Sequence, residues 1–234
     1  MVSIVIPTYN EREGIEKVIE RISKTLHFAR KEYEIIVVDD NSPDGTWHLC
    51  QELTEKFPLR VLRRTDKKGL SSAVIDGWKI ARGDILGVMD ADGSHDEKIL
   101  PHMIEEIEEG KIDLAIGSRY VPGGGTKDWP WFREFTSKTA IKFARPVTKL
   151  KDATSGYCVF RRNIIEDVEL DPIGWKIVLE VQVKGNYKKY EEFPIVFKDR
   201  EKGKSKLSQG AIINYLQHIW KLMQWMKKHN RKPR

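Results

Sequence analysis

Short apolar runs recur along the first half of the chain, and each gives way to polar residues. The runs at 2–6, 34–38 and 85–89 are rich in Val and Ile, which is typical of strands that are buried on both faces. Shorter runs at 59–62 and 112–116 predict two further strands.

Segments with helical spacing of apolar residues separate these runs. The spacing predicts helices from about residue 12 and at 46–57, 71–81 and 97–109. Alternating strands and helices indicate right-handed crossovers and a mostly parallel sheet in an α/β domain. Ligands of such folds bind beyond the carboxyl ends of the strands. We therefore expect the functional residues at that edge, which we call the rim.

Acidic and aromatic side chains gather where the predicted strands end. We expect the first strand to stop at Pro7, because proline has no backbone N–H to give to a neighbouring strand. The side chains that fall on the rim are Tyr9, Glu11, Asp39, Asp40, Asp90 and Asp92.

The second half of the chain has a less regular pattern. Residues 119–131 lack apolar periodicity and contain Pro122 and three glycines. This predicts either a mobile surface loop near the rim or a plain connection. Further elements are expected as an amphipathic stretch at 133–149, strands at 155–160 and 188–197, and helical patterns at 173–183 and 211–226.

Length and composition fit one domain with a C-terminal extension. The 234 residues can bury a sizeable core, and no linker rich in Pro, Gly and Ser divides them. We expect the main domain over residues 1–210 and a basic amphipathic helix over 211–234. Cys50 and Cys158 form no metal or redox pattern, and no signal-peptide pattern precedes the first strand, so we expect a cytoplasmic protein.

The charge balance indicates anionic partners. The net charge is +6, the pI is about 9.1, and six of the last fourteen residues are Lys or Arg. Nucleic acid is one polyanion that such a chain could bind. We expect no nucleic-acid partner, because the chain shows no stacking-aromatic motif and no basic recognition helix.

One apolar run ends in two carboxylates, in the sequence Asp90-Ala91-Asp92. Side chains two residues apart in a strand point to the same side, so both carboxylates can approach one cation. Oxygen ligands suit Mg²⁺ or Mn²⁺, which complete their coordination with waters and substrate phosphates. An ordinary acidic turn gives the same three residues, but the other acidic strand ends favour a nucleotide-diphosphate site.

His95 follows this pair closely and has two interpretations. Its imidazole could be a further ligand of the cation. Alternatively it lies at the start of the next helix, which we favour because Asp96 offers an N-cap there.

Seven short motifs, at 6–11, 38–46, 68–73, 89–92, 117–120, 155–157 and 200–207, extend this picture. Together they resemble the inverting GT-A glycosyltransferases of family 2, and most closely the dolichol-phosphate mannose synthases. The resemblance covers nearly the whole chain. The motifs at 6–11 and 89–92 occur in many family 2 enzymes, whereas the one at 200–207 is more specific to polyprenyl-phosphate glycosyltransferases.

The resemblance implies a GT-A fold, a Rossmann-like and mostly parallel sheet flanked by helices, with a donor site on its rim. The cation, Mg²⁺ or Mn²⁺, would be held on the donor diphosphate by Asp90 and Asp92, with Ala91 between them and Ser94 where relatives have Gln or Ser as a third oxygen ligand. The residues that would frame the donor nucleoside are Pro7, Tyr9, Glu11, Val38 and Asp40.

Basic residues of the family pattern would hold the phosphates of donor and acceptor. They are Arg119, Arg133, Arg200 and Lys206. We expect the basic segment from Arg200 to Lys206 to close over bound phosphates, because Gly203 permits the rearrangement. The resemblance implies Asp92, Arg119, Asp152 and Lys206 as catalytic residues.

The implied reaction is metal-dependent transfer of mannose from GDP-mannose to dolichyl (polyprenyl) phosphate, with inversion. The alternative within the class is a glucosyltransferase that uses UDP-glucose. A phosphate monoester has a second pKa of about 6 and is already a dianion at neutral pH, so this acceptor needs no strong general base. A sugar hydroxyl would need one, and Asp152 is the candidate; it could instead be a turn residue or orient a neighbouring arginine.

The helical pattern at 211–226 mixes aromatic, aliphatic and basic residues and is too short and too polar to span a bilayer. It predicts either an interfacial helix on an anionic membrane or a helix that packs on the domain. A lipid-linked acceptor favours the first, with the protein peripheral on the cytoplasmic face of a membrane. A separate membrane-anchoring subunit is a further candidate partner, and an inactive nucleotide-sugar-binding subunit is an alternative to an enzyme.

Overall fold

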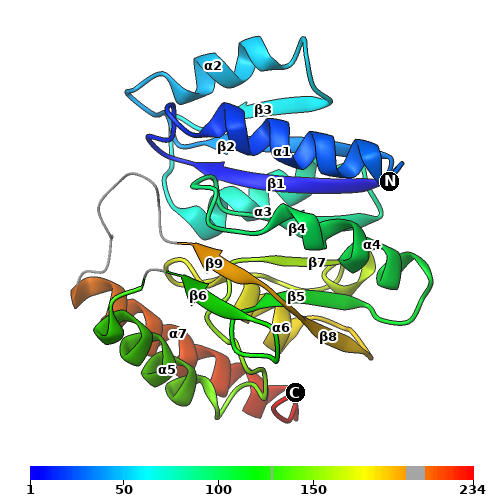
Figure 1. Cartoon of the computed structure of the whole chain (residues 1–234). Helices are drawn as coiled ribbons and strands as arrows, with labels where there is room; N and C mark the ends of the chain where they lie inside the picture. The colour runs from blue at the N-terminus through cyan, green and yellow to red at the C-terminus, as the bar shows by residue number, and fades with distance from the viewer. Residues whose placement is uncertain (128, 199–208) are drawn as a thin grey trace.

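The structure is a computed structural model that describes residues 1–127, 129–198 and 209–234 (Figure 1). Its centre is a seven-stranded sheet with the strand order β3-β2-β1-β4-β7-β5-β8. Strand β7 is antiparallel to both of its neighbours, and the other pairs in this sheet are parallel. The strands are β1 (Val2–Thr8), β2 (Tyr33–Asp39), β3 (Leu59–Arg63), β4 (Ile85–Val88), β5 (Leu114–Ser118), β7 (Cys158–Arg161) and β8 (Tyr190–Pro194).

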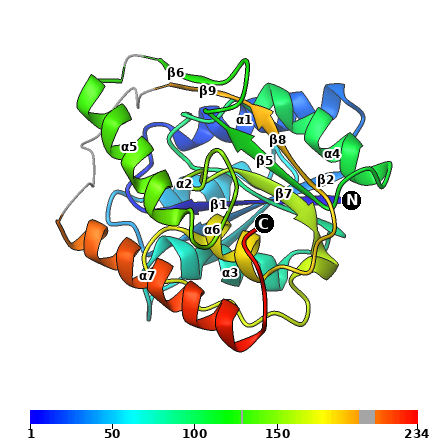
Figure 2. The same cartoon turned by 90° about the horizontal axis from the view of Figure 1, so that it is seen from below.

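Helices cover both faces of the sheet (Figure 2). Ile4 and Ile6 of β1 pack with α1 (Ile15–Phe28), α2 (Thr46–Leu53) and α4 (Leu100–Glu108), the last preceded by the short helix η1 (Glu97–Ile99). Val5 points to the opposite face and packs with α3 (Leu70–Ile80) and α6 (Ile177–Lys184). A second short helix, η2 (Arg162–Ile164), follows β7. Because both faces of these strands are covered, the strands are mostly apolar at consecutive positions.

The predicted stop of the first strand at Pro7 is wrong, since β1 continues to Thr8 and Pro7 pairs with Val38. The pairing of β1 with β4 ends earlier, where Met89 N–H donates to the carbonyl of Val5. At Pro7 there is therefore no neighbouring β4 residue that would need a backbone N–H as donor, and the proline is tolerated.

Two predictions in the second half also need correction. The loop expected at 119–131 contains the short strand β6 (Gly125–Lys127), which pairs in parallel with β9 (Val196–Lys198). The strand expected at 188–197 is two strands, β8 and β9. The division lies at Ile195, whose N–H donates to Ser118 of β5 while its carbonyl accepts from Gly125.

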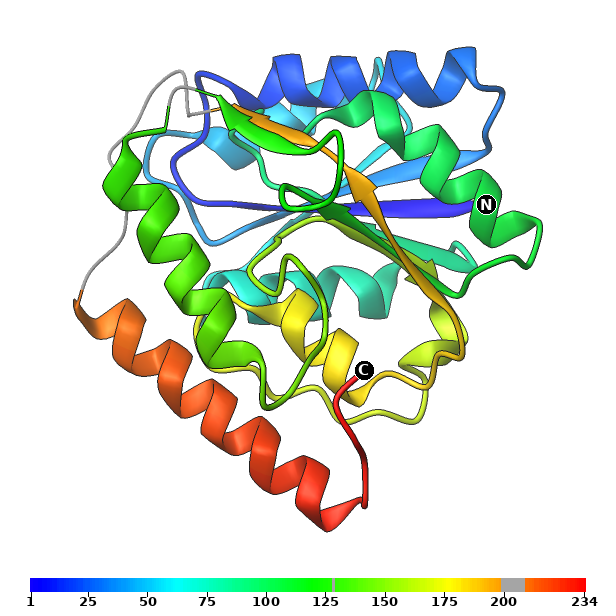
Figure 3. The same cartoon turned by 60° about the horizontal axis from the view of Figure 1, so that its bottom comes forward.

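Two long helices, α5 (Trp131–Ala144) and α7 (Gln209–Lys228), lie side by side (Figures 1 and 3). The hydroxyl of Tyr215 in α7 donates to the carbonyl of Ala140 in α5 over 2.9 Å. One face of α7, including Leu222, shares a small core with Leu179 and Val183 of α6. Among the described helices, none is both long and apolar enough to cross a membrane.

A buried ionic cluster also joins α7 to α6. Glu180 is completely buried and lies 2.7 Å from His218 Nε2 and 2.6 Å from Lys184 Nζ. Burial alone would raise the pKa of Glu180, but its hydrogen bonds to His218 and Lys184 lower the pKa more. The carboxylate is therefore ionised inside the protein and ties the two helices together.

Gly77 offers a test of the contact between α3 and the sheet. A Cβ at this position would lie 2.6 Å from Cγ1 of Val5 and 3.0 Å from Cγ2 of Val38. We expect Gly77→Ala to lower the melting temperature, because overpacking of about 1–3 kcal/mol exceeds a gain in helix propensity of about 1 kcal/mol. Gly125→Ala is the matched control, since its Cβ would have no neighbour within 4 Å. Equal melting temperatures for both variants would contradict this packing.

Candidate active site

A cleft of about 1180 Å³ opens on the rim and extends between α5 and α7. Nine of the residues predicted for the site line it: Pro7, Tyr9, Glu11, Asp40, Asp90, Ala91, Asp92, Arg119 and Arg133. Val38, Ser94 and Asp152 are buried behind the lining. Arg200, Lys206 and the segment expected to close over phosphates lie outside the described residues.

The turns after β1 and β2 have similar backbones. Asn10 and Asn41 adopt left-handed conformations with φ of 61° and 57°, which asparagine tolerates better than most residues. The backbone N–H of Asn10 donates to the hydroxyl of Ser42. Buried Asp39 accepts hydrogen bonds from the hydroxyls of Thr8 and Ser42. The ends of the two strands are thereby joined by side chains.

Asp40 is held by a buried arginine that the sequence motifs did not indicate. Arg64 Nε donates to Asp40 Oδ1 over 2.7 Å, and Arg64 also contacts Asp76 of α3 at 3.0 Å. The N–H of Gly69 donates to Asp40 Oδ2 over 2.7 Å. Gly69 has a φ of 137°, a region nearly closed to other residues, so this bond depends on glycine. The network fixes Asp40 at the edge of the cleft.

His95 contacts Asp90 directly and is almost fully buried. Its Nδ1 accepts the backbone N–H of Asp90 over 3.2 Å, and its Nε2 lies 3.6 Å from the Asp90 carboxylate. The ring stacks on Tyr157 at a centroid distance of 5.1 Å. Asp96 caps η1 as predicted, accepting from the N–H of Lys98. His95 is therefore next to the helix start and also orients Asp90.

Asp92 bonds to its own turn. Its Oδ1 accepts from the backbone N–H of Ser94 over 3.1 Å and from the Ser94 hydroxyl over 2.5 Å. Ser94 is buried, and its hydroxyl is directed to Asp92.

Two carboxylates at one strand end, both lining the cleft, fit a divalent cation that takes other ligands from substrate. The residues that would hold it are Asp90 and Asp92. No group of three or more His, Cys, Asp or Glu side chains suited to a metal occurs in the described part of the chain. Oxygen ligands in this small number match the way Mg²⁺ and Mn²⁺ bind with substrate phosphates, and they do not match a closed structural site.

Arg119 and Asp152 form a buried ion pair with two hydrogen bonds. Arg119 Nε and Nη2 each donate to the Asp152 carboxylate over 2.7 Å, and Nη2 also donates to Thr154 Oγ1 over 2.6 Å. Burial would raise the pKa of Asp152, but the bonds and charge of Arg119 bring this pKa below its ordinary value. The geometry favours the interpretation in which Asp152 orients an arginine.

Aromatic rings that line the cleft lie around Arg119. The guanidinium of Arg119 lies 5.2 Å from the Trp129 ring centre and 5.5 Å from that of Phe197. The guanidinium of Arg133 lies 4.2 Å from the centre of the same Trp129 ring. Both arginines thus make favourable cation–π contacts with one indole.

Lys176 is a cation of the cleft that the sequence motifs did not include. Its Nζ donates to the carbonyl of Thr154 over 2.8 Å. Lys176 and Arg64 were missed because a single basic residue outside a motif gives no local signal. Only the fold brings each of them to the rim.

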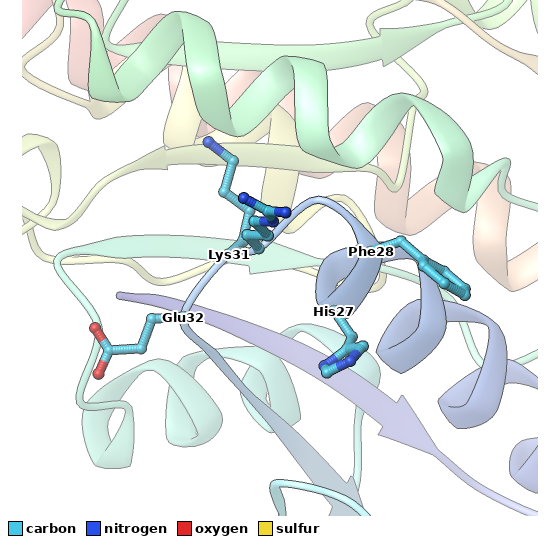
Figure 4. A pocket seen from close by; sticks show the side chains of 5 residues that line it. His27, Phe28, Lys31 and Glu32 are labelled. Carbon is cyan, nitrogen blue, oxygen red and sulfur yellow. The ribbon is translucent and has the colours of Figure 1, made fainter.

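A shallower hollow lies at the opposite end of the sheet, around the C-terminus of α1 (Figure 4). Its labelled side chains His27, Phe28, Lys31 and Glu32 point in different directions and do not converge (Figure 4). Lys31 is paired with Glu108 of α4. We do not assign a ligand to this hollow.

Residues 3–169 match the model of the glycosyl transferase family 2. The chain belongs to glycosyltransferase family 2. A dolichol-phosphate mannosyltransferase of Pyrococcus furiosus is 49% identical over 96% of this chain, which spans 64% of the length of that relative. A polyprenol monophosphomannose synthase of Mycolicibacterium smegmatis is 40% identical over 95% of this chain and 85% of its own length. The resemblance found in the sequence motifs is thus confirmed.

Solved structures of other glycosyltransferases share the fold of this family 2 chain. A mannosyltransferase of Pyrobaculum calidifontis, in complex with GDP-Man and Mn²⁺, aligns with a TM-score of 0.64 and 18% identity over 99% of this chain and 65% of its own. A mannosyl-3-phosphoglycerate synthase of Rubrobacter xylanophilus aligns with a TM-score of 0.67 and 16% identity over 98% and 75%. The predicted GT-A type of α/β fold is confirmed, including its C-terminal helix.

The buried pair of Arg119 and Asp152 leads to a stability prediction for this family 2 chain. We expect Asp152→Asn to lower the free energy of unfolding at pH 7 by about 3–5 kcal/mol, because Arg119 keeps a buried charge without its partner. The folded-state pKa of Asp152 is below the ordinary 3.8, so its contribution is present above that pH and is lost as pH falls through the folded value. Urea unfolding at pH 7 and at pH 3 measures both effects.

The difference between wild type and variant should therefore shrink at pH 3. Glu20→Gln is a control, because it breaks the exposed ion pair of Glu20 with Lys24 and should change stability little. An Asp152→Asn protein as stable as wild type at pH 7 would show that the pair contributes nothing.

Proposed function

We propose that this protein transfers mannose from GDP-mannose to a polyprenyl (dolichyl) phosphate with inversion at the sugar. The observation that carries the proposal is a single cleft with two unlike ends. One end is lined by strand-end carboxylates and the other by apolar side chains of α5 and α7. The named activities of the Pyrococcus furiosus and Mycolicibacterium smegmatis relatives support it.

In this proposal the donor lies at the acidic end of the cleft. Tyr9, Glu11 and Asp40 line this end, and the bonds of Asp40 to Arg64 and Gly69 hold it in place before the nucleoside binds. Asp90 and Asp92 would hold Mg²⁺ or Mn²⁺. The bound cation would neutralise charge on the leaving diphosphate.

The acceptor phosphate attacks C1 of the mannose through one of its oxygens, and the bond from C1 to the diphosphate breaks to release GDP. No protein group needs to remove a proton, because the phosphate is a dianion near neutral pH. The state of Asp152 agrees with this, since its carboxylate is engaged by Arg119 and its pKa is lowered. Such a carboxylate is a weak base.

A turnover assay with labelled nucleotide sugars tests the proposal. We expect transfer from GDP-mannose, and not from UDP-glucose, to a short polyprenyl phosphate in the presence of Mg²⁺ or Mn²⁺. Excess chelator should abolish it, and Asp92→Asn should lower turnover by about 100-fold or more, because transition-state charge is no longer offset. Preferred use of UDP-glucose would establish the glucosyltransferase instead.

Asp96→Asn is the matched control for this variant. Asp96 is close in sequence but caps η1 and does not line the cleft. An asparagine preserves the cap, so turnover should stay near that of wild type. Full activity in excess chelator, with no loss in Asp92→Asn, would remove the metal from the proposal.

We also propose that the outer faces of α5 and α7 lie on a membrane. Trp131, Phe132 and Phe135 of α5 and Ile213 and Trp220 of α7 are exposed, the last by 64%. Arg231 and Arg234 are engaged with backbone carbonyls of the protein. Lys227, Lys228 and Lys232 near the C-terminus are exposed, and their charges are available to anionic lipid.

Vesicle sedimentation tests the membrane contact. We expect binding to anionic vesicles at low salt, release as salt rises, and several-fold weaker binding of the double variant Phe135→Ser, Trp220→Ser. Phe28→Ser is the control, because Phe28 is 81% exposed at the end of α1 far from these helices. Equal loss in the control, or no binding by wild type, would contradict the proposal.

A further inference from the structure

Lys176 is a partly buried cation without a carboxylate partner among the described residues. Its Nζ donates to the Thr154 carbonyl. Burial, followed by the charge of Arg119, lowers the pKa of Lys176 to about 8. Two fully buried cations of the described residues, Arg64 and Lys184, do have counter-ions: Arg64 contacts Asp40 and Asp76, and Lys184 contacts Glu180. An ammonium in this state would gain stability from an anion bound in the cleft.

The strand order places Lys176 away from the donor end. Along the rim come the ends of β2 and β1 with Asp40 and Tyr9, then the end of β4 with Asp90, and then β7 and β5. Thr154, which accepts from Lys176, precedes β7, and Arg119 follows β5. The carboxylate pair therefore lies between the nucleoside end and Lys176.

Thr154 also connects Lys176 to α5. Its hydroxyl accepts from Arg119 and lies 3.5 Å from the hydroxyl of Ser137 on α5. Beyond Ser137 the cleft is walled by apolar side chains such as Phe143 of α5 and Leu216 of α7. Lys176 thus lies where the polar part of the cleft meets its apolar part.

We propose that Lys176 binds the phosphate head of the acceptor, a phosphate monoester whose apolar chain lies between α5 and α7. This inference rests on the proposed function and names the residue that receives its second substrate. The ammonium supplies charge-assisted hydrogen bonds to the phosphate. The alternative source of the same chemistry is the diphosphate of the donor.

Calorimetric binding with separate probes tests the assignment. Farnesyl phosphate probes the acceptor site in the presence of GDP and Mn²⁺, and GDP with Mn²⁺ alone probes the donor site. We expect Lys176→Met to weaken the binding of farnesyl phosphate by about 10- to 100-fold. The affinity for GDP should stay within about twofold of the wild-type value. Lys176→Arg should recover part of the loss, because it keeps the charge. Lys142→Met, an exposed lysine of α5, is the matched control and should bind as wild type does.

The melting temperature of Lys176→Met shows whether the variant folds. We expect it to equal or exceed that of wild type without ligand, because the substitution removes a partly buried charge that lacks a counter-ion. A fall in GDP affinity alone would assign Lys176 to the donor and overturn the proposal. Unchanged farnesyl phosphate binding in Lys176→Met, or none in wild type, would overturn it as well. If farnesyl phosphate binding depends on Lys176 but no mannose is transferred, the assignment of Lys176 is supported and the proposed function is wrong.

Discussion

Carboxylates at the buried end of a parallel sheet must receive hydrogen-bond donors, and the architecture of the rim depends on this requirement. Asp39 accepts hydrogen bonds from hydroxyl groups at both strand ends. Asp40 accepts a hydrogen bond from Arg64, and Asp152 accepts one from Arg119. Removal from water disfavours an ionised carboxylate unless such donors compensate. Apart from Ser42, these donors come from segments distant in sequence, so each bond also fixes the position of a loop.

The order of the strands then arranges chemistry along the rim. The ends of β2 and β1 supply an acidic and aromatic surface, the end of β4 supplies the carboxylate pair, and Arg119 and Lys176 lie near the ends of β5 and β7. Because β7 enters the sheet between β4 and β5, Thr154, which precedes β7, lies on the rim, where both it and Lys176 line the cleft. The insertion of one antiparallel strand thus decides which residues line this part of the cleft.

Much of the architecture could be predicted from the sequence, because strands buried on both faces leave long apolar runs such as 34–38. Strands β6 and β9 have three residues each, too few to form a periodic pattern. In the cleft, a sequence motif indicated Asp90 and Asp92, because these two carboxylates lie only two positions apart in the chain. The pairing of Arg119 with Asp152, 33 residues away, and the position of Lys176 depend on tertiary structure, which no local pattern encodes.

The apolar wall of the cleft continues onto the outside of the protein. Phe132 and Phe135 of α5 and Ile212 and Leu216 of α7 line the cleft and are also exposed. With these faces on a bilayer, a lipid could slide into the cleft without its chain passing through water. Its supply would then be a two-dimensional process, governed by the density of the lipid in the membrane and not by its concentration in solution, while a nucleotide sugar would still arrive by diffusion in three dimensions.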